Sequence, residues 1–171
     1  MIAPHGSAEL LPLYVADEAE RAALAAEAEG LPSLLLNSAA AANAVMLGAG
    51  YFSPLPGFMS KADALSVAET LHTTNGLFWP VPILNINDNL AGFEVGQRIA
   101  LRDPNVEGHP VLAIQRIDAI EPLSESERET IVREVFATDD AEHPGVATFR
   151  ALGSNIISVP IQVLNFSYFP A

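Results

Sequence analysis

The sequence predicts an α+β fold with a helical N-terminal third, followed by a curled sheet or small barrel. Up to residue 72, segments rich in Ala, Leu and Glu begin at capping residues, whereas short β-branched runs broken by Gly, Asn and Pro follow residue 79. A chain of 171 residues can bury a core without cross-links. No linker rich in Pro, Gly or Ser divides it, so a single domain is predicted over 1–171.

The first two helices are predicted by their caps. Segment 17–30 begins at an aspartate N-cap and has Gly30 at the position that follows a helix end. Segment 37–48 can be capped by its asparagine or by the next serine, and it ends at a glycine. The residues between them, LPSLLL, predict a short buried connector or strand.

Two further helices are predicted by a cap combined with an apolar stripe. A serine opens 60–72, and its buried face is expected to consist of Leu65, Ala68 and Leu71. A Ser-x-x-Glu capping box opens 124–136.

The sheet is predicted to begin at WPVPILNIN (79–87). Further strands are expected in RIALRD (98–103), HPVLAIQRIDAI (109–120) and NIISVPIQVLN (155–165). The lengths of the first two are typical of a small barrel or a curled sheet.

The stretch GYFSPLPGFM (50–59) has two prolines, two glycines, three aromatic residues and no charge. It predicts a packed irregular turn, because proline restricts the backbone, glycine permits turns, and the apolar side chains can fill the gap between two helices. None of these side chains can act as an acid, base or nucleophile.

The charge balance disfavours polyanions as partners. Eight Lys plus Arg against 21 Asp plus Glu give a net charge of −13, with Lys61 as the one lysine and seven dispersed arginines. Nucleic-acid binders neutralise phosphates with clustered basic residues, so no nucleic-acid partner is expected. No apolar run is long enough for a membrane span, and no signal peptide is visible. The expected location is cytoplasmic, with which the absence of cysteine is compatible.

Acidic residues and a histidine gather in TDDAEHPGV (138–146), which raises the possibility of a divalent metal site. The spacing matches neither a calcium loop nor a helical zinc pair. The favoured interpretation is structural: Thr138 or Asp139 caps a turn, and His143 fixes a tight bend with its ring hydrogen-bonded to backbone.

The other chemically interesting residues also favour structural roles. His5, His72 and His109 are isolated in sequence and are expected to be structural or exposed, and the glycine-containing GAGY and GSN lack the pattern of phosphate loops. Four aromatic residues could stack a nucleic-acid base, but without a basic groove a core position is favoured. They are Phe52, Phe58, Phe78 and Trp79.

Four stretches together resemble the N-terminal domain of the ATP sulfurylase (sulfate adenylyltransferase) family in order and spacing. Tyr51 and Ala137 replace glycines of the family pattern without removing a functional group. The stretches are GYFSPLPGFM (50–59), NGLFWPVPI (75–83), GQRIALRDP (96–104) and VFATDDAEHPGV (135–146).

The resemblance implies a PUA-like curled β-barrel with flanking helices, which precedes a larger catalytic nucleotide-binding domain in that family. The family's enzymes work in sulfur metabolism and, using Mg-ATP, join sulfate to the α-phosphate to give adenosine 5′-phosphosulfate and pyrophosphate. Their Q-x-R-N-P-x-H-x-x-H and G-R-D motifs are missing from 1–171. The resemblance therefore implies no catalytic, cofactor-binding or metal-binding residue here.

What the resemblance implies for function is a scaffold and interface for a catalytic domain missing from this chain, joined in cis or in trans, within a possible homo-oligomer. The chain is then a fragment of a longer polypeptide and inactive alone. The alternative is a stand-alone PUA-like module that binds RNA or a small ligand, with the charge opposing RNA. A complete enzyme in 171 residues is disfavoured, because no nucleophile, metal cluster or anion cradle is recognisable.

The end of the chain is apolar and has no charge after Arg150. One sheet face cannot bury every member of this run, since alternate side chains point to opposite faces. An exposed apolar patch or self-association surface is therefore expected at 165–169, formed by Phe166, Tyr168 and Phe169.

Overall fold

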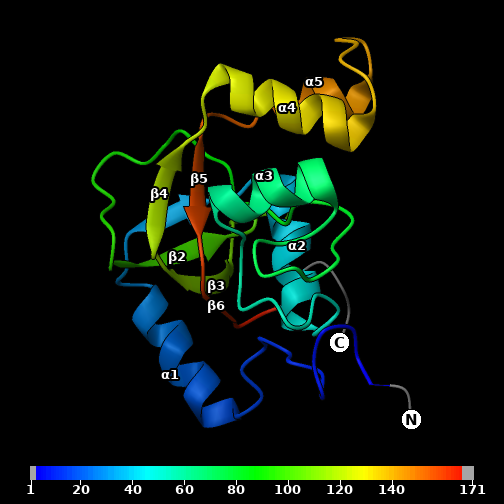
Figure 1. The fold of residues 1–171 in the computed structure, drawn as a ribbon. Helices are drawn as coiled ribbons and strands as arrows, with labels where there is room; N and C mark the ends of the chain where they lie inside the picture. The colour runs from blue at the N-terminus through cyan, green and yellow to red at the C-terminus, as the bar shows by residue number, and fades with distance from the viewer. Residues whose placement is uncertain (1–2, 167–171) are drawn as a thin grey trace.

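A computed structural model describes residues 3–166, which form five helices and six strands in an α+β arrangement (Figure 1). The helices are α1 (Glu18–Ala28), α2 (Ser38–Gly48), α3 (Lys61–Thr70), α4 (Glu125–Phe136) and α5 (Pro144–Arg150). The strands are β1 (Ser33–Leu35), β2 (Arg98–Arg102), β3 (Val111–Arg116), β4 (Ala119–Pro122), β5 (Asn155–Ser158) and β6 (Ile161–Val163). The helical N-terminal third is confirmed, and α5 was not predicted.

The predicted caps set the starts of the first four helices. Asn37, rather than Ser38, caps α2, because its side chain accepts a hydrogen bond from the Ala40 amide at 2.9 Å. The capping box of α4 is present in both directions between Ser124 and Glu127. These interactions satisfy backbone N–H groups that have no partner within a helix.

The predicted buried face of α3 is wrong at Leu71. The helix ends at Thr70, and Leu71 follows as a left-handed C-cap with φ 59°, which leaves its side chain 47% exposed. A residue in this conformation no longer continues the helical face, so the sequence spacing does not apply to it. The buried side chains of α3 are Ala64, Val67 and Ala68.

The strands form two sheets, one with the order β1-β2-β3-β6 and one that pairs β4 with β5. The prediction that the sheet begins at 79–87 is wrong in two respects. β1 already pairs in parallel with β2, and the 79–87 segment contributes only a single bridge, between Ile86 and Ile156. Pro80 and Pro82 lack the N–H groups that a regular ladder requires.

Two predicted strands, 109–120 and 155–165, are each divided in the structure. The first breaks after β3 at Ile117 and Asp118, and the second breaks between β5 and β6 at Val159 and Pro160. Each therefore passes from one sheet into the other. The result is a curled sheet rather than a closed barrel, consistent with the expected PUA-like fold.

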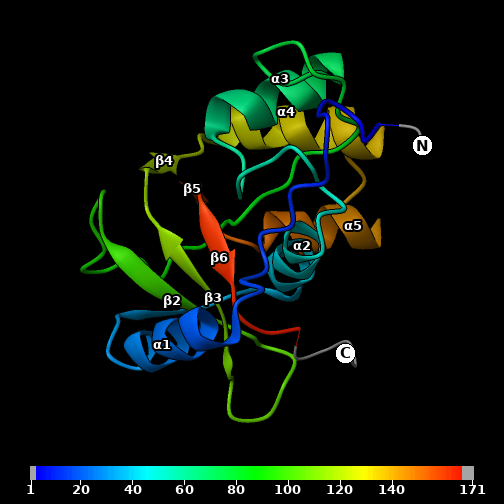
Figure 2. The ribbon, with the colours of Figure 1, turned by 90° about the horizontal axis from the view of Figure 1, so that it is seen from below.

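Helices cover both faces of the four-stranded sheet. α1 packs beneath it in a small cluster with Ala28, Ala100 and Ile114, whereas α2 and α3 belong to the main core on the other side. Figure 1 shows α1 and the α4–α5 pair at opposite ends of the molecule. Figure 2 shows α3 running beside α4, and α5 packs against α4.

The prediction that Phe166 is left over from the core is wrong. Its ring stacks on Tyr14 with centroids 4.5 Å apart, and it packs against the main core. Gly48 makes room for it, because a Cβ there would lie 3.0 Å from the Phe166 ring. The other two residues of the predicted patch, Tyr168 and Phe169, lie outside the described residues.

Replacing Phe166 with Ser is expected to destabilise the fold by roughly 1 to 2 kcal/mol, because it removes a half-buried ring from the core and the stacking on Tyr14. Urea unfolding followed by circular dichroism measures the change. Val95→Ser is the control, since Val95 is 64% exposed. Equal midpoints for the two variants would show that Phe166 contributes nothing to the core.

Candidate functional site

The turn at 50–59 packs as predicted and builds one wall of an apolar pocket. Phe58 and Met59 are buried, and the Met59 amide donates to the Ile83 carbonyl at 2.8 Å. Gly57 lies so close to the 159–161 segment that a Cβ would be 3.0 Å from Pro160 Cα. These contacts of the second half of the turn fix the position of its first half, whose residues 51–53 line the pocket.

The pocket, here called the aromatic pocket, has a volume of about 340 Å³. Phe52 and Trp79 pack edge to face with ring centroids 6.0 Å apart and form its inner part. Tyr51 and Phe78, 73% and 47% exposed, form its rim. Its lining includes His5, Tyr51, Phe52, Phe78, Trp79 and Val81.

The prediction of core positions for the four aromatic residues is confirmed for Phe58 and Trp79 and wrong for Phe78. Residues 77–79 are extended, so successive side chains alternate between inside and outside. The Trp79 amide donates to the Leu71 carbonyl at 2.7 Å, which directs Trp79 inward and leaves Phe78 on the surface.

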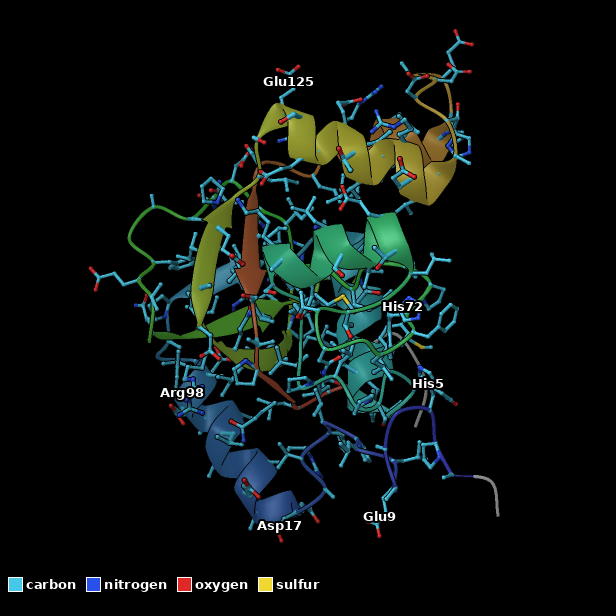
Figure 3. The ribbon with its side chains drawn as sticks, viewed as in Figure 1. His5, Glu9, Asp17, His72, Arg98 and Glu125 are labelled. Atoms are coloured by element: carbon cyan, nitrogen blue, oxygen red, sulfur yellow. The ribbon has the colours of Figure 1, made fainter. Side chains whose placement is uncertain are left out.

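Two histidines contact Phe78 at the rim of the aromatic pocket. His5 Nε2 donates to the Phe78 carbonyl at 2.7 Å, and the His72 ring packs edge to face on Phe78 with centroids 5.7 Å apart. Figure 3 shows both histidines on the same side of the molecule, away from Arg98. His109 lies elsewhere and bonds the Asp103 carbonyl. All four histidines are exposed, as predicted for His5, His72 and His109.

The acidic segment 138–146 has a structural arrangement. Thr138 Oγ1 accepts from the Asp140 amide at 3.2 Å, and His143 Nδ1 accepts from the Val146 amide at 3.4 Å. His143 bonds backbone as predicted, but it caps helix α5 rather than fixing a bend. Within residues 3–166, no three His, Asp or Glu side chains converge in a way that could hold a metal ion.

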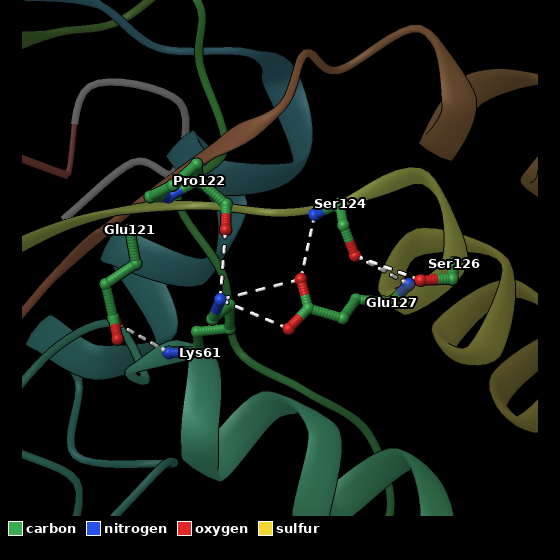
Figure 4. A network of polar contacts seen from close by, with 6 residues as sticks. All are labelled: Lys61, Glu121, Pro122, Ser124, Ser126 and Glu127. Atoms are coloured by element: carbon green, nitrogen blue, oxygen red, sulfur yellow. Dashed lines mark hydrogen bonds and ion pairs between the residues drawn. The ribbon is translucent and has the colours of Figure 1, made fainter.

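Lys61, the one lysine, is held between α3 and the start of α4 (Figure 4). Its Nζ donates to the Pro122 carbonyl at 3.1 Å and lies 3.1 Å from a Glu127 carboxylate oxygen. The Ser124 amide, which donates to Glu127 at 2.8 Å, lowers the pKa of that carboxyl most strongly, and Lys61 adds to the effect. Lys61 therefore joins two helices.

Most other basic side chains are also engaged with acidic ones. Five arginines form ion pairs, and the pair of Arg150 with Glu129 lowers the pKa of the carboxyl and raises that of the guanidinium. Arg21 bonds backbone carbonyls next to the Tyr14 ring. Arg128 donates to the Arg150 carbonyl, while its buried Nε has no partner within 3–166.

Asp88 is the remaining residue with a shifted pKa. Its carboxylate holds a loop in place and has no catalytic partner among residues 3–166. Its carboxylate accepts from the Ser154 amide at 2.7 Å and from the Asn155 side chain at 3.2 Å. The Ser154 amide is the main reason that the pKa of Asp88 is lowered. Each shifted pKa thus has a local structural cause, and the aromatic pocket offers apolar contact and the imidazole of His5. Its chemistry fits binding better than catalysis.

Comparison with known proteins gives one family and a consistent set of relatives. The profile of the PUA-like domain family matches residues 2–166. Sulfate adenylyltransferases from Alcanivorax borkumensis and Allochromatium vinosum are 57% and 53% identical over 99% of this chain, which spans 42% and 43% of their lengths. The enzyme of the Riftia pachyptila sulfur-oxidizing endosymbiont is 47% identical over the whole chain, which covers 39% of that protein.

A solved structure supports the fold. A hexameric APS kinase from Thiobacillus denitrificans superposes with a TM-score of 0.69 at 27% identity, and the match covers 99% of this chain and 28% of that chain. The chain thus spans about two-fifths of the length of the curated relatives that it matches. No helix among residues 3–166 is long and apolar enough to cross a membrane.

Lys61→Met is expected to lower stability at pH 7 by about 0.5 to 1.5 kcal/mol, since it removes the ion pair with Glu127 and the bond to Pro122. Glu127 has a folded-state pKa below its ordinary 4.5, so its stabilising effect is present above that value and lost as pH falls through the folded pKa. The difference between variant and parent should therefore shrink in acid.

Thermal unfolding at a series of pH values measures this difference. Arg133→Met, which breaks an exposed pair with Glu134, is the control and should change little at any pH. A Lys61→Met effect that stays constant over the whole acidic range in which carboxyl groups become protonated would contradict the assigned role of Glu127.

Proposed function

The chain belongs to the PUA-like domain family, and from this membership we propose that it is the N-terminal domain of a sulfate adenylyltransferase. The parent enzyme would join sulfate to ATP, giving adenosine 5′-phosphosulfate and pyrophosphate. Residues 1–171 would act as one folded domain that supports a catalytic domain and contributes to an oligomer.

One observation supports this proposal above all: 57% identity to a sulfate adenylyltransferase over 99% of the chain. Identity at this level along the whole length is difficult to reconcile with an unrelated binding module. More than half of each relative's length has no counterpart in this chain, and the proposal assigns the catalytic chemistry to that part.

The character of the described side chains agrees with a supporting role. Adenylyl transfer from ATP requires preorganised positive or hydrogen-bonding groups around anionic substrates. Here Lys61 and five of the seven arginines are already paired with carboxylates. The proposal therefore assigns no catalytic residue and no cofactor site to this chain, and Mg-ATP would be bound by the catalytic domain. An enzyme that uses ATP and sulfate would work in the cytoplasm.

A chimera tests the proposed function. We expect this chain, joined to the part of the Alcanivorax borkumensis enzyme beyond the matched region, to release pyrophosphate from ATP in a sulfate-dependent manner. The chain alone should release none, because the basic groups of residues 3–166 are mostly paired with carboxylates and form no cluster for anions. A coupled pyrophosphate assay measures both, with the unaltered Alcanivorax enzyme as the positive control.

A folded but inactive chimera would contradict the proposal, as would turnover by the purified chain alone.

RNA binding is expected to be absent at physiological salt. The phosphate neutralisation that drives non-specific binding needs free basic groups, and most here are paired with acids in a chain of net charge −13. Fluorescence anisotropy with a generic single-stranded RNA measures binding. A submicromolar, salt-sensitive dissociation constant would favour the alternative of a stand-alone RNA-binding module.

A further inference from the structure

The exposed large apolar side chains are concentrated in one region. Eight are exposed among the described residues, and six of them surround the aromatic pocket or adjoin it. The remaining two, Leu35 and Val95, lie elsewhere. The six are Leu10, Leu11, Leu71, Tyr51, Phe78 and Val81.

Backbone hydrogen bonds bring the segments that carry these six side chains together, and the six are here called the aromatic face. The Leu11 amide donates to Ser53 Oγ at 2.8 Å, which brings 10–11 to the pocket lining. The Trp79 amide bonds the Leu71 carbonyl, which brings Leu71 to the other side. Scattered exposed apolar residues are normal on any protein, but a gathered set marks an interaction surface.

The aromatic face is also distinguished by its lack of charge. Among residues 3–166, no Lys, Arg, Asp or Glu lines the aromatic pocket, whose titratable lining residues are His5 and Tyr51, while His72 packs on Phe78 beside it. A chain of net charge −13 presents carboxylates over much of its surface. An uncharged aromatic surface matches the centre of a protein interface, which is depleted in charge and rich in Tyr, Trp and Phe.

The position of the aromatic face favours one occupant. Phe166, the last described residue, contacts Gly48, three residues before Tyr51. The amides of Leu13 and Tyr14 donate to the carbonyls of Leu47 and Gly48 at the same helix end. In the matched relatives, which this chain covers for about two-fifths of their length, the polypeptide continues beyond the matched region. That continuation would emerge beside the aromatic face.

We propose that the aromatic face is the docking surface for the catalytic domain of the sulfate adenylyltransferase, with Tyr51 and Phe78 as its main contact residues. This inference rests on the proposed function. The occupant presents an uncharged, largely apolar surface that covers both rings. The same contact would fill the aromatic pocket and exclude water from Trp79.

Hydroxyl-radical footprinting with mass spectrometry tests the inference on the isolated chain and on the chimera. Tyr51 and Phe78 should oxidise roughly fivefold or more slowly in the chimera, since side chains at an interface centre are removed from solvent. Leu35 and Val95 should oxidise equally in both proteins. Unchanged rates at Tyr51 and Phe78 overturn the docking surface.

A paired variant gives a second readout. In the chimera, Tyr51→Ser with Phe78→Ser should separate the thermal unfolding of this chain from that of the catalytic domain, whereas Leu35→Ser with Val95→Ser should not. Both pairs replace exposed apolar side chains, so fold stability is affected similarly. Identical melting curves for the two pairs overturn the proposal.

The outcomes separate this inference from the proposed function. An active chimera with an unprotected aromatic face overturns the docking surface alone. An inactive chimera with protected rings contradicts the proposed activity and supports the docking surface. Protection in the isolated chain that increases with its concentration means that a second copy is the occupant, which also overturns the inference.

Discussion

The side chain of Gln115 forms the polar junction on which the arrangement of the two sheets depends. It is fully buried on β3, accepts from Asn85 Nδ2 at 3.2 Å, and donates to the carbonyls of Ile157 and Val159 at 3.4 Å each. These partners lie in segments far apart in sequence, at the place where the chain passes from β5 toward β6. A buried amide without partners costs about 1 to 3 kcal/mol, so other packings of these segments are penalised. The core is therefore specified by a polar contact as well as by apolar packing.

Local signals explain why the helices could be predicted from sequence. The caps at Asp17, Ser60 and Ser124 act on the backbone within three residues and need no knowledge of the rest of the fold. Strand limits depend on partners that the sequence does not identify. β1 is only three residues long and exists because β2 lies beside it, and Pro160 divides a run of apolar residues that otherwise resembles one strand. Helix α5 was missed because His143 is an unusual cap and Gly145 a weak helix former.

At the candidate site, too, features that depend on local sequence could be predicted, whereas features that depend on distant residues could not. The packed turn at 50–59 could be predicted, because Pro and Gly restrict and permit backbone conformations locally. The approach of His5 to Phe78 could not, since the two residues are 73 positions apart in the sequence. Phe166 illustrates the same limit. The uncharged C-terminal segment predicted an exposed apolar patch, but Gly48 has no Cβ and so leaves space in which the Phe166 ring packs. Such a fit between distant residues leaves no trace in the pattern of either segment.

The bridge between Tyr14 and Val163 has a consequence for how this protein is made. The Val15 amide bonds the Val163 carbonyl, and the Val163 amide bonds the Leu13 carbonyl, so the start of the chain is paired with its last described strand. On the ribosome, residues near 14 emerge long before residue 163 has been synthesised. The nascent N-terminal segment must wait without its partner, and closing so long a loop makes folding slow. During that interval Leu10, Leu11 and Tyr14 are available to chaperones and to neighbouring chains.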